Sequence, residues 1–137
     1  MVKLIQDIWI LEESGVVVFH RVYDEHLDPQ LFGGLMTALN SFAEALSKGG
    51  LTNFELKSKR FSVIKRKTFL FIANSSKTFK IKKVVQELES IANRFFEIYP
   101  EDVLFNFDGD IKRFVDFEKE IENSLQETIR KFQNALW

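Results

Sequence analysis

The sequence predicts a single mixed α/β domain over residues 1–137, with elements in the order β-β-α-β-β-β-α-α. Two apolar runs near the start, LIQDIWIL (4–11) and VVVFHRVY (16–23), are joined by the short polar segment EESG. A long amphipathic stretch follows at 29–48, and three short runs rich in Phe, Ile, Val and Thr come next. Apolar residues then recur at helical spacing in two later segments. These patterns predict a hairpin, a helix, three further strands and two helices.

The first two strands are expected to pair as a hairpin at the centre of the sheet. Their residues are almost continuously apolar, which is typical of strands buried on both faces, whereas a half-exposed strand alternates. The connection between them has four residues, and Gly15 can adopt the positive φ that such loops commonly require.

The first helix is expected over 29–48. Asp28 is a suitable N-cap acceptor, Pro29 has its φ already helical, and Gly49 with Gly50 supplies a left-handed stop. Large apolar side chains recur at spacings of three and four, which predicts the core face of the helix. This stripe contains Leu31, Leu35, Leu39, Phe42 and Leu46, and it is widened on one side by Phe32, Met36 and Ala43.

Two adjacent glycines inside this helix need a compensating interaction. Gly33 and Gly34 each cost about 1 kcal/mol relative to alanine in a helix interior. Close packing on the sheet is one explanation, and close approach of a partner backbone is the other. Helical geometry places Gly33 away from the predicted core stripe and Gly34 near its margin.

The next three strands are expected at 51–56, 61–64 and 68–73, because these runs combine apolar alternation with β-branched and aromatic residues. The last of them is almost continuously apolar and is expected beside the first hairpin. Together they predict a meander.

Two helices complete the predicted order. Thr78 is the expected N-cap of the first, and Pro100 ends it. Asp110 is expected to cap the second, which follows a loop containing Asp108 and Gly109. Its apolar face is predicted to comprise Phe114, Phe117, Ile121, Leu125, Ile129, Phe132 and Leu136.

The chain resembles the longin domain in this order of elements and in several segments. These are WILEESG, VVVFHRVY, LFGGLMTALNSFAEAL and the late segment FDGDIKRFVDF. The resemblance implies a profilin-like sandwich with a five-stranded, mainly antiparallel sheet, one helix on one face and two on the other. The related roadblock domain usually begins with a helix, and none is predicted before Leu4, which favours longin over roadblock.

The resemblance to longin domains also implies a role. They serve as platforms for protein partners, often small GTPases, in vesicle trafficking and related assemblies. A non-catalytic interaction module is therefore expected, as a stand-alone subunit that regulates a small GTPase or joins a trafficking-type assembly. Pairing with itself or with another longin- or roadblock-type subunit is implied as well. Nucleic acid is not an expected partner, because no reading motif is present and the pI is near 6.1.

No catalytic, cofactor-binding or metal site is predicted. His20 and His26 are the only histidines, there is no cysteine, and no phosphate-binding, zinc-protease or nucleophile-elbow motif is present. Asp108 and Asp110 are more typical of a turn with an N-cap than of a cation site. The remaining alternative is an enzyme with an unrecognised pocket that uses a polar residue such as His20.

The expected partner-binding surface is a groove between the first helix and the edge strand near 51–56. One helix can hardly cover five strands, and an exposed edge strand permits addition of a partner strand. The residues predicted to contact the partner are Phe32, Gly33, Met36, Phe54 and Leu56. An ordinary wide core stripe is the competing explanation for the helical residues.

A basic block supports a second hypothesis. Residues 57–86 contain ten Lys or Arg and no Asp or Glu, whereas the whole chain has a formal charge of -1. Six of them are expected to form one cationic edge: Lys57, Lys59, Arg60, Lys65, Arg66 and Lys67. Such an edge either protects the sheet from aggregation or binds an acidic protein or anionic lipid. Peripheral binding to an anionic membrane is therefore the alternative function.

The expected location is the cytoplasm, with or without contact at a membrane surface. The absence of cysteine fits a reducing compartment. No apolar run approaches the roughly 20 residues of a membrane span, and the N-terminus lacks the order of a signal peptide.

Overall fold

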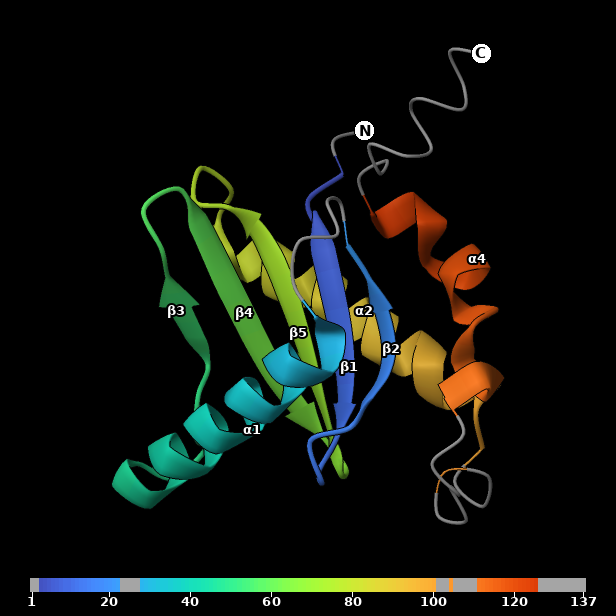
Figure 1. Cartoon of the computed structure of the whole chain (residues 1–137). Coiled ribbons are helices and arrows are strands. Elements are labelled where there is room, and N and C mark those ends of the chain that lie inside the picture. Colours follow the sequence, from blue (N-terminus) through green and yellow to red (C-terminus); the bar gives the residue numbers. More distant parts are fainter. Residues whose placement is uncertain (1–2, 23–27, 101–103, 105–110, 126–137) are drawn as a thin grey trace.

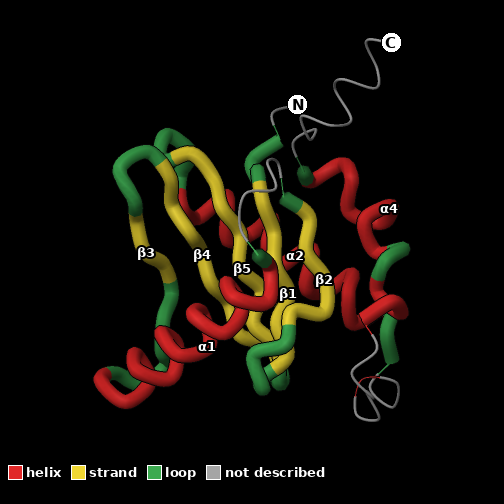
Figure 2. Tube along the Cα trace, viewed as in Figure 1, coloured by secondary structure: helices red, strands yellow, loops and turns green. Residues whose placement is uncertain are grey.

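The fold is a three-layer α+β sandwich, seen in a computed structural model that describes residues 3–22, 28–100, 104 and 111–125. One helix lies in front of a five-stranded antiparallel sheet, α2 lies behind it, and the C-terminal helical segments lie beside the β2 edge (Figure 1; Figure 2). The strands are β1 (Asp7–Glu12), β2 (Val17–Arg21), β3 (Asn53–Glu55), β4 (Lys59–Arg66) and β5 (Phe69–Ser76). The helical segments are α1 (Pro29–Leu46), α2 (Ile81–Ile98), η1 (Ile111–Phe114), α4 (Phe117–Ile121) and η2 (Glu122–Ser124).

The strand order is β2-β1-β5-β4-β3, and every neighbouring pair is antiparallel. The prediction that the fifth strand lies beside the first hairpin is confirmed, because β1 pairs with β5 from Asp7↔Asn74 to Glu12↔Phe69. The prediction that both hairpin strands are central is wrong for β2, which lies at the edge of the sheet. Its apolar residues are nevertheless buried, because the C-terminal segments pack beside it; the Phe19 and Phe117 rings are 5.3 Å apart.

The core has one layer on each side of the sheet, and β5 contributes to both. Phe69 and Phe71 belong to the layer behind the sheet, whereas Leu70 and Ile72 belong to the layer beneath α1. This alternation is the period of two expected for a strand. Both faces of β5 are therefore buried, which explains its almost continuous apolar sequence.

The ends of α1 follow the predicted signals. The Asp28 carboxylate accepts hydrogen bonds from the backbone N–H groups of Gln30 and Leu31, at 2.9 and 3.2 Å. After Leu46 the chain leaves the helix, and Gly49 and Gly50 both have positive φ, at 99° and 71°. The N-cap and the glycine stop are thus confirmed.

The fourth strand is longer than predicted. β4 extends from Lys59 to Arg66 because its charged ends pair with Ser76 and Phe69 of β5. Lys67 and Thr68 form the short connection to β5, and Lys67 has a φ of 56°.

The start of α2 also differs from the prediction. Lys80 occupies the N-cap position, whereas the backbone N–H of Thr78 donates to Ser76 Oγ in the preceding turn. The helix ends at Ile98, before Pro100, as predicted.

The C-terminal segment is broken where a continuous helix was predicted. Within the described residues it consists of η1, α4 and η2, after which Leu125 forms a parallel bridge with Ile5. The predicted core residues Phe114, Phe117, Ile121 and Leu125 are all buried, so the apolar spacing was correct. The extended backbone at Leu125 interrupts the helix and allows that bridge. Asp110 and residues 126–137 lie outside the described residues.

Candidate functional site

The main candidate surface is the outer face of α1, where large apolar side chains are exposed. These are Leu31, Leu35, Leu39, Phe42 and Leu46, with exposed fractions between 39 and 74%. They form the stripe that was predicted to face the core, and that prediction is wrong. The apolar arc of α1 covers two neighbouring sides of the helix, and periodicity alone does not tell which side meets the sheet.

Gly33 determines which side of α1 meets the sheet. A Cβ at Gly33 would lie 2.5 Å from Val17 Cγ2 and 2.6 Å from the carbonyl oxygen of Gly15. The helix therefore approaches the β1–β2 hairpin as closely as only glycine permits, which supports close packing as the explanation for this residue. Gly34 lies on the exposed side, and a Cβ there would have no neighbour within 4 Å.

Phe32 and Met36 are buried with Gly33 between α1 and the sheet, which contradicts the surface positions predicted for all three. Phe32 stacks on Trp9 with a centroid distance of 4.1 Å. Because the first turns of the helix rest on these aromatic rings, the three residues hold α1 on the sheet. They are not available to an approaching partner.

A line of aromatic rings continues from this contact to the edge of the sheet. Phe61 lies 6.0 Å from both Trp9 and Phe32, and Phe54 of β3 stacks on Phe61 at 4.6 Å. Phe54 is half-buried and Leu56 is exposed. These two residues are the predicted partner contacts that remain at the surface.

The backbone of β3 can receive a further strand. The Leu56 N–H donates to Lys59 O and the Val63 N–H donates to Thr52 O, at 2.8 and 2.9 Å. Because alternate residues of a strand direct their N–H and C=O groups to opposite sides, those of Asn53 and Glu55 point away from β4. In the described part of the chain β3 is the outermost strand at this edge, so this backbone edge adjoins the aromatic line.

The predicted cationic edge is divided into two groups, so the prediction of one continuous edge is wrong. Lys57, Lys59 and Arg60 lie where β4 begins, and Lys65, Arg66 and Lys67 lie where it ends. Arg60 and Lys65 are five positions apart along the extended strand, which is about 16 Å.

Several of these cations also have acidic partners. Arg60 pairs with Glu55 at 3.1 Å, Lys65 with Glu44 at 3.3 Å and Arg66 with Glu89 at 2.9 Å. The last two pairs join β4 to α1 and to α2. Within this edge, charge therefore serves partly to connect neighbouring elements.

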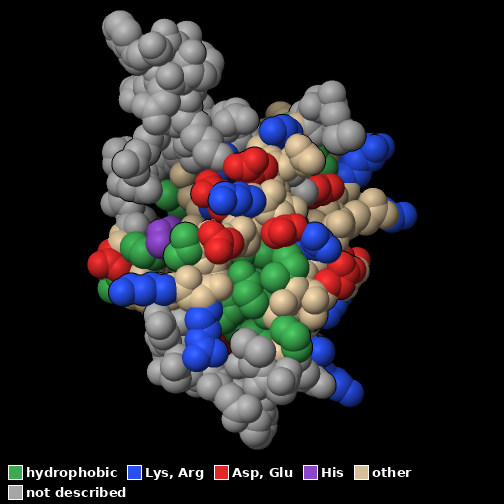
Figure 3. Space-filling view, turned by 90° about the vertical axis from the view of Figure 1, so that its right-hand side faces the viewer, with side chains coloured by type: hydrophobic (Ala, Val, Ile, Leu, Met, Phe, Trp, Pro, Cys, Tyr) green, Lys and Arg blue, Asp and Glu red, His purple; other side chains and the backbone are tan. Residues whose placement is uncertain are grey.

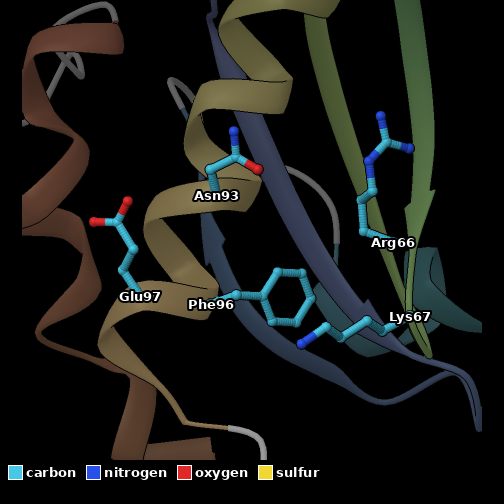
Figure 4. A pocket seen from close by; sticks show the side chains of 5 residues that line it. All are labelled: Arg66, Lys67, Asn93, Phe96 and Glu97. Atoms are coloured by element: carbon cyan, nitrogen blue, oxygen red, sulfur yellow. The ribbon is translucent and has the colours of Figure 1, made fainter.

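A hollow of about 520 Å³ lies between the β4–β5 connection and α2 (Figure 4). It is lined by Arg66, Lys67, Asn93, Phe96 and Glu97. Figure 4 shows the Lys67 side chain directed at Phe96, and its Nζ lies 4.7 Å from the ring centroid, a cation–π contact. None of these five side chains is a hydroxyl, thiol or imidazole, so the lining offers no serine, threonine or cysteine nucleophile and no histidine base.

The side of the molecule that carries β2 and α4 has acidic and basic side chains mixed over it (Figure 3). Ion pairs connect the elements there: Arg94 of α2 pairs with Glu120 of α4, and Arg21 of β2 with Glu118. Hydrogen bonds to Glu120 and then Glu97 raise the pKa of the Arg94 guanidinium. Burial, followed by the charges of Asp116 and Glu120, raises the pKa of the nearby Tyr99 phenol.

The residues considered for catalysis or metal binding do not assemble into a site in the described part of the chain. His20 is exposed on β2, while His26, Asp108 and Asp110 lie outside the described residues. Among residues 3–22, 28–100, 104 and 111–125, no three His, Cys, Asp or Glu side chains form a group that could hold a metal ion. None of the helices in those ranges is both long and apolar enough to cross a membrane.

Comparison with known proteins identifies the fold. MglB of Myxococcus xanthus has a TM-score of 0.54 and 9% identity, and the match covers 68% of this chain and 77% of that one. A Roadblock/LC7 domain from Streptomyces avermitilis has a TM-score of 0.52 and 13% identity. That match covers 68% of this chain and 87% of the Streptomyces chain. The gliding protein MglB of Thermus thermophilus has a TM-score of 0.50 and 14% identity. That match covers 61% of this chain and 70% of the Thermus chain.

These structures show a roadblock/longin-type fold. They do not single out the longin domain, so the predicted preference for longin over roadblock is not confirmed. The sequence itself matches no family model and no curated protein. At such low identity the likeness concerns the fold alone, and function has to be argued from the surface.

Proposed function

We propose that this protein is a non-catalytic interaction module that binds a protein partner through the outer face of α1 and the adjoining edge of β3. The observation that carries this proposal is the exposed stripe of five large apolar residues on one helix. A helix at the surface of a monomer normally presents polar residues to water. A contiguous apolar patch marks a site of interaction.

The partner best suited to this surface is another helix. Beside the apolar stripe, α1 exposes a row of small residues: Gly34, Ala38, Ser41 and Ala45. Large and small side chains in adjacent rows allow two helices to interdigitate at short distance. Burial of each large apolar side chain contributes about 1.5–3 kcal/mol. A few such contacts are sufficient for a stable complex.

We propose a second copy of this chain as the first partner, giving a homodimer. In an antiparallel pair of α1 helices, Asp28 at the start of one helix faces Lys48 after the end of the other. In an antiparallel pair the positive end of each helix dipole also lies beside the negative end of the other, which is favourable. Pairing with a related longin- or roadblock-type subunit would use the same surface.

Charge substitutions in the stripe test this proposal. Leu35→Glu combined with Phe42→Glu places two carboxylates where the partner helix would pack, and we expect the dissociation constant of the dimer to rise at least about 100-fold. Light scattering and analytical ultracentrifugation measure the change. The matched control is Gln86→Glu with Ser90→Glu on the exposed face of α2, which adds the same charge and should leave the dimer intact. A wild-type protein that stays monomeric at high concentration would refute self-association.

The finer proposal is regulation of a small GTPase or membership of a trafficking-type assembly, and it is supported by the resemblance to longin domains. We expect the wild-type protein to retain a purified small GTPase in one nucleotide state, GDP-bound or GTP-bound, in preference to the other. Pull-down with each state measures this preference. Asn53→Pro provides an edge-specific control, because it removes an N–H that points away from β4 and should weaken only binding by strand addition. If the protein captures a stable partner of another class and no GTPase in either state, the GTPase part is wrong and the interaction module stands.

A further inference from the structure

A second surface lies at the end of the sheet where β3 ends and β4 begins. The β3–β4 turn and the loop between β5 and α2 both rise at this end (Figure 1). Lys77 Nζ lies 3.2 Å from a Glu55 carboxylate oxygen, and the Arg60 guanidinium donates to the Phe79 carbonyl oxygen at 2.9 Å. These contacts bring two segments that are about twenty residues apart in sequence into one surface, here called the basic end. It comprises Leu56, Lys57, Lys80, Ile81, Lys82 and Lys83.

The lysines of the basic end carry uncompensated charge. Within the described ranges, the exposed ammonium groups of Lys57, Lys80, Lys82 and Lys83 have no ion pair or side-chain hydrogen bond. Glu55, at the end of β3, already pairs with Lys77 and Arg60, whose hydrogen bonds lower its pKa. Positive charge at this end is therefore neutralised less than at the other end of β4, where Lys65 and Arg66 each have a carboxylate partner.

The start of α2 is unfavourable for these lysines in the isolated protein. The first turn contains no acidic residue, and Lys80 at the N-cap makes no side-chain capping bond. The positive end of the helix dipole and the adjacent ammonium groups repel one another. A nearby anionic surface would relieve this repulsion.

Two apolar side chains protrude among the lysines. Leu56 is 55% exposed beside Lys57, and Ile81 is 38% exposed between Lys80 and Lys82. Basic residues interleaved with exposed aliphatic ones are typical of protein surfaces that bind the lipid–water interface. The combination differs from the outer face of α1, where apolar side chains are exposed without a lysine between them.

We infer that the basic end binds an anionic membrane surface, with Lys57, Lys80, Lys82 and Lys83 facing the headgroups and Leu56 and Ile81 entering the interface. Lysine is a point charge suited to a diffuse negative surface, whereas recognition of an individual phosphate favours the arginine fork. This surface includes only Lys57 of the predicted cationic edge and adds the start of α2. It leaves the outer face of α1 free and shares only Leu56 with the region of the β3 edge, so the inference does not rest on the proposed function.

Vesicle sedimentation tests the inference with the full-length protein. We expect binding to vesicles of phosphatidylcholine with phosphatidylserine, no binding to phosphatidylcholine alone, and a decrease as salt is added. Replacing Lys80, Lys82 and Lys83 with glutamine should weaken the binding roughly 100-fold, since each lysine near an anionic surface contributes about a factor of five. Leu56→Ser with Ile81→Ser should weaken the part of the binding that persists at high salt.

The matched control removes three cations at the opposite end of β4, by replacing Lys65, Arg66 and Lys67 with glutamine. This variant loses the same net charge as the triple lysine variant, and we expect it to bind the anionic vesicles as tightly as the wild type does. Circular dichroism checks that each variant is folded. Equal loss in both triple variants would show that net charge alone drives binding and would overturn the inference. Failure of the wild-type protein to sediment with the anionic vesicles would also overturn the inference. If that protein binds polyglutamate instead, the basic end is a site for an acidic protein partner and not for a membrane.

Discussion

Phe95→Ala is expected to lower the free energy of unfolding by about 3–5 kcal/mol. The side chain has no exposed surface, and its ring contacts aromatic rings from several elements. Those rings belong to Phe69, Phe71, Phe96, Tyr99, Phe114 and Phe117, at centroid distances of 5.0–5.7 Å. Truncation leaves a cavity at the point where β5, α2 and the C-terminal segments meet. Chemical denaturation followed by circular dichroism measures the loss.

Phe42→Ala is the matched control for this prediction. Phe42 is the same residue type on α1, but 66% of its surface is exposed. Its removal should change the stability of the monomer by no more than about 0.5 kcal/mol. Both variants should be compared at one low protein concentration, because self-association stabilises the folded state by mass action. Equal effects of the two substitutions would show that the two-sided core described above is wrong.

The second large effect is expected from two adjacent glycines that should respond in opposite directions. Gly33→Ala brings a methyl group within 2.6 Å of a backbone oxygen, so α1 must shift away from the hairpin. Overpacking of this kind costs about 1–3 kcal/mol. Gly34→Ala enters open space and removes the helix penalty of glycine, so it should stabilise the protein by about 0.5–1 kcal/mol.

Thermal and chemical unfolding of the two alanine variants provide the measurement. Because the substitutions are identical and the positions adjacent, differences in helix propensity cancel between them. A stabilising Gly33→Ala would contradict the close contact between α1 and Gly15. A destabilising Gly34→Ala would show that this exposed position is closely packed in solution, for instance in a dimer that persists at the concentration used.

The order of elements was predictable because local signals determine it. Asp28, Pro29 and the glycine pair after Lys48 mark the ends of α1 through backbone chemistry that needs no tertiary information. The position of β5 beside β1 was also predicted, from the almost continuously apolar sequence of β5, which is typical of a strand buried on both faces.

The inward side of α1 was not predictable from periodicity, because two sides of the helix are apolar. What decides between them is the distance between backbones at Gly33, and the glycine was the available signal. A glycine inside a helix lowers the stability of the helix, so it is best explained where a neighbouring backbone approaches the helix most closely. That reasoning would have placed Phe32 and Met36 inside and the leucine stripe outside.

The edge position of β2 and the division of the cationic residues were missed for a related reason. Both depend on which segments distant in sequence lie side by side. β2 is covered by residues near Phe117, about a hundred positions later. The lysines that join Lys57 at the basic end come from the start of α2, beyond the whole of β5. Charge counts along the chain do not contain this information.

The pairing of β1 with β5 has a consequence for synthesis on the ribosome. β1 and β2 can form their hairpin as soon as Arg21 has emerged, but the other edge of β1 has no partner until the segment beginning at Phe69 follows. At typical elongation rates this interval lasts on the order of several seconds. Throughout it an apolar strand edge is open to nascent chains on neighbouring ribosomes, so chaperone demand should be greatest before β5 is made. Slowing translation between β2 and β5 should therefore lower the soluble yield more than slowing it after β5.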